Sequence, residues 1–228
     1  MITSGYLAIE PINTIAPKYP HIRFALLDEI AKKAPNVVSV VFSENEGSFL
    51  VGYLVGAFSK TKKVAFLGGV DIDPVQNFLL GFQKGVHYAN PLVKVQVHYL
   101  SKIPDFSGFI DPAKGYKKTQ ELYNQGVDIV YAVAGGSNNG IIQAAKEEQK
   151  WVIGVDSDQD FMAPGLVLTS MMKRLDVAII NLCQKLVENK LEVGQVVELN
   201  LEQGGVSLTP MQYTRFIIPE KTLQELEK

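Results

Sequence analysis

Short apolar segments alternate with longer amphipathic stretches along most of the chain. Most of the apolar segments are continuous and rich in β-branched residues, and they cover 23–28, 37–42, 63–68, 93–99, 128–133, 151–156 and 166–169. Such runs are typical of strands buried on both faces of a parallel sheet. Helical spacing fills the intervals 44–58, 73–89, 113–125, 138–149 and 173–190. The alternation predicts right-handed strand–helix–strand units, and therefore an α/β protein with doubly wound parallel sheets.

The predicted strands are more than one small sheet conveniently holds, so we expect two lobes. The polar segment 59–63 is the predicted first crossing between them, and a later crossing is expected within 161–171, around Pro164 and Gly165. A closing helix is expected over 220–228. The resulting lobes comprise 1–60 with about 170–191, and 61–169 with about 192–228.

Composition and charge narrow the class of protein. The 228 residues are 46% apolar, and 22 basic against 24 acidic side chains give a net charge of −2, which argues against nucleic-acid binding through bulk charge. No apolar run is long enough to span a bilayer. The single cysteine, Cys183, excludes an internal disulfide, and its place in the apolar run 177–183 predicts a buried structural thiol.

Motifs of metal, nucleotide and hydrolytic chemistry are missing from the sequence. His21, His87 and His98 have no metal-ligand spacing, and there is neither a Gly-x-Ser-x-Gly elbow nor a Gly-x-Gly-x-x-Gly or Walker loop. Residues 156–167 begin like a calcium loop but carry Phe and Val where that loop needs Gly and Glu. These patterns favour a binding protein over an enzyme, with no cofactor and no metal.

Ligands of open parallel sheets bind at the carboxyl ends of the strands. The residues that follow the predicted strands include carboxylates, glycine pairs and aromatics, namely Asp28, Glu44, Glu46, Gly68, Gly69, Phe109, Gly135, Gly136 and Asp156. The Gly135–Gly136 pair is either a tight turn or a place where backbone N–H groups face a ligand oxygen. Asp156 could accept protons from two sugar hydroxyls or serve as a turn residue. Lys173 is either a solvated helix lysine or a hydrogen-bond donor into the cleft.

Seven segments carry a resemblance to a known family. They are Phe42–Gly56, Lys63–Gly69, Phe78–Gly85, Gly126–Val130, Ala134–Gly136, Ile153–Gln159 and Leu168–Lys173. In this order they resemble the basic membrane protein family, the purine nucleoside receptor lipoproteins of bacteria. The resemblance implies the type I periplasmic-binding-protein fold, with two α/β lobes joined by three crossings. It also implies a nucleoside site between the lobes and service to an ABC importer.

The resemblance also implies roles for individual residues on the base side of the ligand. Phe109 resembles the aromatic that stacks on the base, although Phe106 lies only three residues away. Base stacking contributes about 1–3 kcal/mol in nucleic-acid contacts. Gly69 and Gly135 would allow close approach of the backbone.

The resemblance also implies ligand contacts for three charged residues. Asp28 would contact the ligand from the end of a strand in the first lobe. Asp156 would accept the ribose hydroxyl protons, and Lys173 would donate to the ribose from the hinge side. A buried acid paired with hydroxyls would select a nucleoside over a free base.

Family members begin with a signal peptide, a lipidated cysteine and a first βαβ unit, whereas this chain starts after that region. We interpret it as an N-terminally truncated member with the first βαβ unit missing. Since the first strand is normally central, its loss predicts a gap between neighbouring strands and an open apolar edge. Localisation at the cell surface or periplasm is implied, with membrane attachment only through a lipid anchor that this sequence does not contain.

The sequence therefore predicts the substrate-binding component of an ABC importer. Its expected partners are a purine nucleoside, such as inosine, adenosine or guanosine, and a permease, with no nucleic acid. Alternatives are a cytoplasmic small-molecule-sensing domain of the same fold, as in sugar-responsive repressors, an α/β enzyme, and a non-functional truncated product.

Overall fold

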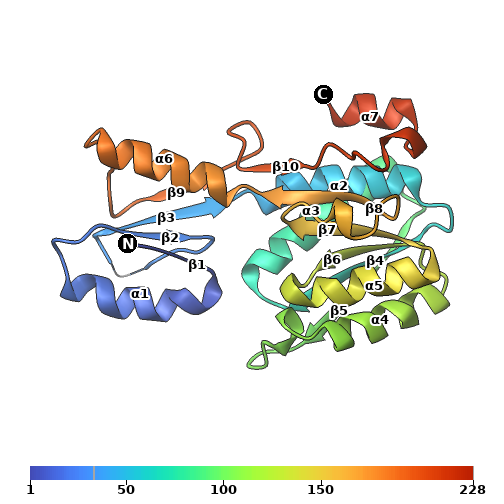
Figure 1. The fold of residues 1–228 in the computed structure, drawn as a ribbon, viewed down its shortest axis with the longest axis horizontal. Helices are drawn as coiled ribbons and strands as arrows, with labels where there is room; N and C mark the ends of the chain where they lie inside the picture. The colour runs from blue at the N-terminus through green and yellow to red at the C-terminus, as the bar shows by residue number, and fades with distance from the viewer. Residues whose placement is uncertain (33, 228) are drawn as a thin grey trace. The chain divides into compact units, whose positions relative to one another are not determined.

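The computed structural model describes residues 1–32 and 34–227, which form an α/β protein (Figure 1). The chain divides into two compact units. Unit 1 comprises Met1–Ser43 and Arg174–Val206, and unit 2 comprises Glu44–Lys173 and Ser207–Lys228. The chain consequently passes between the units at three points, which agrees with the connectivity that the resemblance implies.

Unit 1 is built on a parallel sheet with the strand order β1-β2-β3-β9. Its elements are β1 (Ile2–Ser4), η1 (Tyr6–Ala8), α1 (Ile9–Ile15), η2 (Ala16–Lys18), β2 (Phe24–Leu27), β3 (Val37–Phe42), α6 (Leu175–Val187) and β9 (Val196–Leu199). Helices α1 and α6 lie on opposite faces of this sheet in Figure 1. Under α1, a buried cluster includes Ile12, Ala16, Phe24, Leu26 and Val37. The described strands pair without interruption, so the expected gap between neighbouring strands was wrong.

Unit 2 contains a sheet with the order β10-β8-β7-β6-β4-β5. Its strands are β4 (Lys63–Val70), β5 (Lys94–Ser101), β6 (Ile129–Val133), β7 (Trp151–Asp156), β8 (Val167–Lys173) and β10 (Val206–Leu208), which begins at the unit boundary. Its helices are α2 (Glu44–Phe58), α3 (Asp73–Ala89), η3 (Ser107–Phe109), α4 (Pro112–Asn124), η4 (Gly135–Ser137), α5 (Asn138–Glu148), η5 (Asp160–Met162), η6 (Arg215–Ile217) and α7 (Glu220–Leu226). Figure 1 shows α4 and α5 together on one side of the sheet.

Helices α2 and α3 approach each other closely because glycines line their contact. A Cβ on Gly81 would lie 2.1 Å from the carbonyl oxygen of Asn45, and one on Gly85 would lie 2.1 Å from that of Phe49. No side chain fits at such a separation. The pair therefore packs backbone against backbone, which places the first residue of α2, Glu44, beside the sheet.

Parallel pairing brings the ends of the unit 2 strands to a common edge. Strand β4 pairs in parallel with β5 and β6, β6 with β7, and β7 with β8. Asp156, the last residue of β7, lies opposite Met172 of β8. The carboxyl ends of five neighbouring strands therefore form one edge, the carboxyl edge of unit 2, and side chains after each strand can meet there.

The boundaries between the units differ from those expected. Helix α2 belongs to unit 2 rather than to the first lobe, because it packs on α3 and β8, and β9 belongs to unit 1, because it pairs with β3. The segment 161–171 lies wholly within unit 2, and the crossing falls between Lys173 and Arg174.

Two local expectations were wrong. Lys173 is the last residue of β8, and α6 begins only at Leu175. Cys183 is exposed, since the residues that α6 buries are Ala178 and Leu182. No helix among the described residues has the length and apolar character needed to cross a bilayer.

Candidate functional site

Five of the predicted ligand residues lie along the carboxyl edge of unit 2. In the order of the strands across the sheet, they are Lys173 at the end of β8, Asp156 at the end of β7, Gly135 after β6, Gly69 near the end of β4 and Phe109 after β5. Asp28, the sixth, directly follows β2 in unit 1. The rule that ligands bind at strand carboxyl ends thus selected residues that the fold brings to one edge.

Phe109 and the two predicted glycines are in direct contact. A Cβ placed on Gly69 would lie 2.4 Å from Cδ1 and 2.5 Å from Cε1 of the Phe109 ring. A Cβ on Gly135 would lie 3.2 Å from the Phe109 carbonyl oxygen, and Gly135 has a φ of 53°, which favours glycine. The ring of Phe109 therefore rests on the Gly69 backbone, and this contact belongs to Phe109 rather than to Phe106.

Hydrogen bonds fix the short helix η3 that carries Phe109. The Gly108 N–H donates to Ser101 Oγ at 2.9 Å, and Ser101 Oγ donates to the Asp105 carbonyl oxygen at 2.6 Å. On the other side, Ser137 Oγ donates to the Gly108 carbonyl oxygen at 2.8 Å. Since Ser137 belongs to the turn of Gly135, this hydrogen bond fixes the position of the Phe109 segment relative to the glycine turn.

Asp28 and Asp156 share an unusual backbone conformation. Their φ angles are 73° and 67°, in the left-handed region that non-glycine residues rarely adopt. Each lies at the carboxyl end of a buried strand, and the Asp156 side chain is exposed. Asp is among the residues that best tolerate this region, and such strain concentrates at functional sites. The conformation is compatible with a ligand role and with a turn role for both residues.

Lys173 is buried and paired rather than solvated. Its Nζ lies 3.3 Å from Glu44 Oε1, and the two side chains are 4% and 5% exposed. Nζ also lies 5.0 Å from the centroid of the Phe78 ring, and Asn77 Nδ2 donates to Glu44 Oε2 at 3.3 Å. An ammonium with three hydrogens can hold Glu44 and still donate to a ligand. Glu44 was noted in the sequence as a residue after a strand, but only the fold reveals its pairing with Lys173.

Gln159 is a second residue whose position the sequence did not reveal. Its Oε1 accepts hydrogen bonds from the Val155 N–H and from Asn138 Nδ2, both at 3.2 Å. It thereby joins the turn that follows Asp156 to the start of α5. Only its place inside the motif 153–159 could have drawn attention to it.

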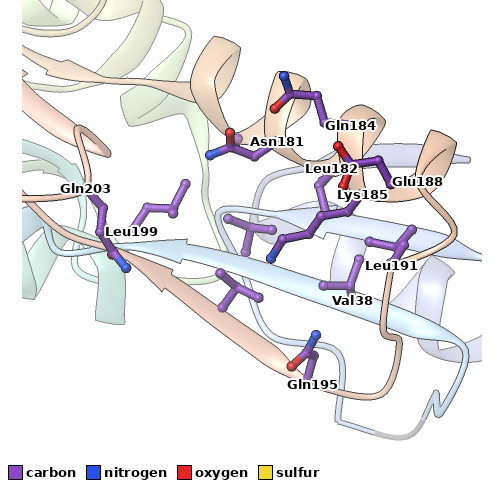
Figure 2. Close-up of a pocket in the computed structure, with 13 residues that line it drawn as sticks. Val38, Asn181, Leu182, Gln184, Lys185, Glu188, Leu191, Gln195, Leu199 and Gln203 are labelled. Atoms are coloured by element: carbon purple, nitrogen blue, oxygen red, sulfur yellow. The ribbon is translucent and has the colours of Figure 1, made fainter.

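Unit 1 has a separate pocket of about 310 Å³ between α6 and strands β3 and β9 (Figure 2). Val38 and Leu182 line its interior, and Asn181, Lys185 and Gln195 contribute polar groups. None of the predicted ligand residues lines it. Among the described residues there is also no cluster of His, Cys, Asp or Glu that could hold a metal ion.

The doubly wound two-unit fold is that of ABC solute-binding proteins. A crystal structure of an ABC transporter solute-binding protein from Aeropyrum pernix K1 superposes with a TM-score of 0.80 at 28% identity, covering 99% of this chain and 68% of that one. The chain belongs to the basic membrane protein (Bmp) family, whose model, described as "ABC transporter substrate-binding protein PnrA-like", matches residues 1–228.

Curated proteins are similar to this chain in sequence along most of its length. The "CD4+ T-cell-stimulating antigen" of Listeria monocytogenes is 33% identical over 224 residues, covering 91% of this chain and 61% of the relative. The "ABC transporter nucleoside-binding protein BmpA" of Lactococcus lactis is 29% identical over 221 residues, covering 90% and 61%. The chain therefore spans about three fifths of the length of these relatives.

Proposed function

We propose that this protein binds a purine nucleoside and delivers it to the permease of an ABC importer. The observation that carries the proposal is the row of groups on the carboxyl edge of unit 2, where an aromatic ring, a glycine turn, a carboxylate and a buried ammonium follow successive strands. Each suits a different part of a nucleoside. The name of the Lactococcus relative supports the same ligand class.

The aromatic side of the edge suits a purine base. Phe109 offers its ring for stacking, and the backbone turn beside it is held by Ser137. Stacking accepts any base, because every base has a π face. Selection of purines would then depend on the backbone N–H and C=O groups of the Gly135 turn. Because glycine has no side chain, these groups could form hydrogen bonds with the edge of the base.

The charged side of the edge suits a ribose. Asp156 would accept protons from the ribose hydroxyls, and Lys173, anchored by Glu44, would donate to a ribose oxygen. A hydrogen bond to a charged group contributes about 1.5–3 kcal/mol. Asp28, at the end of a strand in unit 1, remains a predicted ligand contact.

Family membership favours a binding role over catalysis and over cytoplasmic sensing. We infer that the protein acts at the cell surface or in the periplasm, as a lipid-anchored substrate-binding protein does. The competing proposals are a cytoplasmic sensing domain of the same fold and a non-functional truncated product. Nucleoside binding by the purified chain would exclude the last of these.

The test is calorimetric titration with inosine, adenosine, guanosine, uridine, ribose and adenine. We expect binding of purine nucleosides and no measurable binding of ribose or adenine. Asp156→Ala should weaken nucleoside binding about a hundredfold or more, through the loss of two charge-assisted hydrogen bonds, while the chain still folds and unfolds cooperatively.

Glu121→Ala is the matched control for that variant. It removes one exposed carboxylate from the last turn of α4, which precedes β6 and therefore lies at the opposite edge of the sheet. It should bind nucleosides as the unaltered chain does. Equal affinity in Asp156→Ala and the unaltered chain would refute the assignment of Asp156.

A further inference from the structure

The turn that follows Asp156 is tied down by a buried polar network, here called the Gln159 network, made of Gln159, Asn138, Ser170, Asp160 and Thr209. Asn138, Ser170, Asp160 and Thr209 are all less than 5% exposed. They come from the start of α5, from β8, from η5 and from the segment after β10. The network therefore joins four segments behind the turn that begins with the exposed Asp156.

Gln159 is the centre of this network. Its backbone N–H donates to Ser170 Oγ at 3.0 Å, and its side-chain oxygen accepts from Val155 N–H and from Asn138 Nδ2, each at 3.2 Å. The Val155 N–H belongs to the residue directly before Asp156. The side chain of Gln159 thus binds the end of β7, and its backbone N–H fixes the end of the turn that follows Asp156.

The rest of the network holds Gln159 in place. Ser170 Oγ donates to Asp160 Oδ1 at 2.7 Å, and the Ser170 N–H donates to Thr209 Oγ1 at 2.9 Å. Burial raises the pKa of the Asp160 carboxyl above its usual value of 3.8, and its hydrogen bonds to Thr209 and Ser170 oppose that shift. Every hydroxyl in this chain of contacts has a partner, so the network is rigid rather than adaptable.

Space for Gln159 is provided by Gly154. A Cβ at that position would lie 2.5 Å from Ser170 Oγ and 2.8 Å from Gln159 Oε1. Strand β7 therefore lets the glutamine side chain fold back under its own end. This compact arrangement supports the left-handed conformation of Asp156, whose φ of 67° costs free energy unless the surroundings impose it.

We propose that Gln159 is a positioning residue that sets the orientation of the Asp156 carboxylate and thereby the preference for ribose hydroxyls. The inference rests on the proposed function, since it assigns Asp156 to the ribose. The base side keeps contacts that do not involve Gln159, because Asn138 also accepts from the Ala134 N–H at 3.1 Å and donates to the Ala132 carbonyl oxygen at 3.0 Å. Loss of Gln159 should therefore affect sugar recognition more than base stacking.

The decisive variants are Gln159→Met and Gln159→Glu. Methionine has a similar length and lacks the accepting oxygen, whereas glutamate keeps an oxygen that can accept both hydrogen bonds. The affinities for inosine and for 2′,3′-dideoxyinosine are measured for each variant. The ratio of the affinity for inosine to that for 2′,3′-dideoxyinosine should fall about tenfold in Gln159→Met, as expected when one charge-assisted hydrogen bond is lost. Gln159→Glu should retain the ratio of the unaltered chain.

A double-mutant cycle with Asp156→Ala separates positioning from general destabilisation. Once the carboxylate is gone, Gln159→Met should change inosine affinity less than twofold, because no oriented group remains to lose. A merely structural residue would lower affinity for both ligands equally and would do so in either background. Unchanged inosine preference in Gln159→Met, or full additivity in the cycle, would overturn the proposal.

Amide hydrogen exchange on the ligand-free chain gives a readout that does not depend on nucleoside binding. Gln159→Met removes the acceptor of the Val155 N–H, so exchange at Val155 should accelerate relative to amides of β6. If the unaltered chain bound no nucleoside, the proposed function would fail. Selective acceleration at Val155 would then still show that Gln159 holds the end of β7 beside Asp156, and unchanged exchange would overturn that part of the proposal.

Discussion

A methyl group on Gly69 would test the contact on which the aromatic side of the site depends. In Gly69→Ala the new Cβ would stand 2.4 Å from one carbon of the Phe109 ring and 2.5 Å from another, whereas ordinary contact begins near 3.4 Å. The ring must therefore retreat by at least about 1 Å. It cannot do so freely, because the neighbouring Gly108 is held by Ser101 on one side and Ser137 on the other.

The expected magnitude has two parts. Overpacking of this kind costs about 1–3 kcal/mol of folding free energy. Displacement of the stacking ring removes up to the stacking contribution of about 1–3 kcal/mol per base, which corresponds to about 5- to 150-fold weaker nucleoside binding. Gly136→Ala is the matched control, because its Cβ would meet only the Phe109 carbonyl oxygen at 3.2 Å. Gly136→Ala should therefore lose clearly less unfolding free energy and less inosine affinity than Gly69→Ala.

Urea unfolding and calorimetric titration with inosine provide the assay. The key comparison is Gly69→Ala in the unaltered chain and in a Phe109→Ala background. Without the ring there is nothing to displace, so the methyl group should cost little unfolding free energy in that background. An equal cost with and without the ring would refute the reasoning, since it would mean that the ring does not rest on Gly69.

Three further outcomes are expected. Phe109→Ala should weaken binding of inosine and of 2′,3′-dideoxyinosine alike, about tenfold or more, and unchanged affinity for both in a titration would place the stacking aromatic elsewhere. Lys173→Met should destabilise unit 2 by about 3–5 kcal/mol in urea unfolding, because it leaves the buried Glu44 uncompensated, and adding Glu44→Gln should restore most of the loss. Asp160 has a raised pKa in the folded chain, so the native state holds its proton more tightly and stability falls as pH rises above about 3.8. Asp160→Asn should remove that decline, and an identical pH profile of stability in both chains would contradict the assignment.

Local patterning determined most of the secondary structure. Helices α2 and α3 span the predicted intervals 44–58 and 73–89, and α5 ends within one residue of its predicted limit. Helices α3 and α5 have amphipathic periodicity, and all three helices have polar residues at their ends, which are properties of the local sequence. The strand β1 and helix α1 were not predicted, because a strand as short as Ile2–Ser4 is defined by its pairing with β2 and not by its own residues.

Position along the sheet was also predictable from the sequence. Once a parallel sheet is inferred, residues directly after the strands must gather at its carboxyl edge, and Gly69, Gly135 and Asp156 do so. The motifs resembling the basic membrane protein family then gave these positions candidate roles. Both steps need only the order of residues along the chain.

Contacts between distant segments were decided by the tertiary structure alone. The apolar run 177–183 is apolar around most of the helix, so periodicity could not tell which side faces the sheet, and Cys183 proved to be exposed. Lys173 is buried because the glycine-lined packing of α2 on α3 brings Glu44 to it. A charge far away in sequence cannot be foreseen from local pattern, since its effect depends on distance and burial, which exist only in the folded chain.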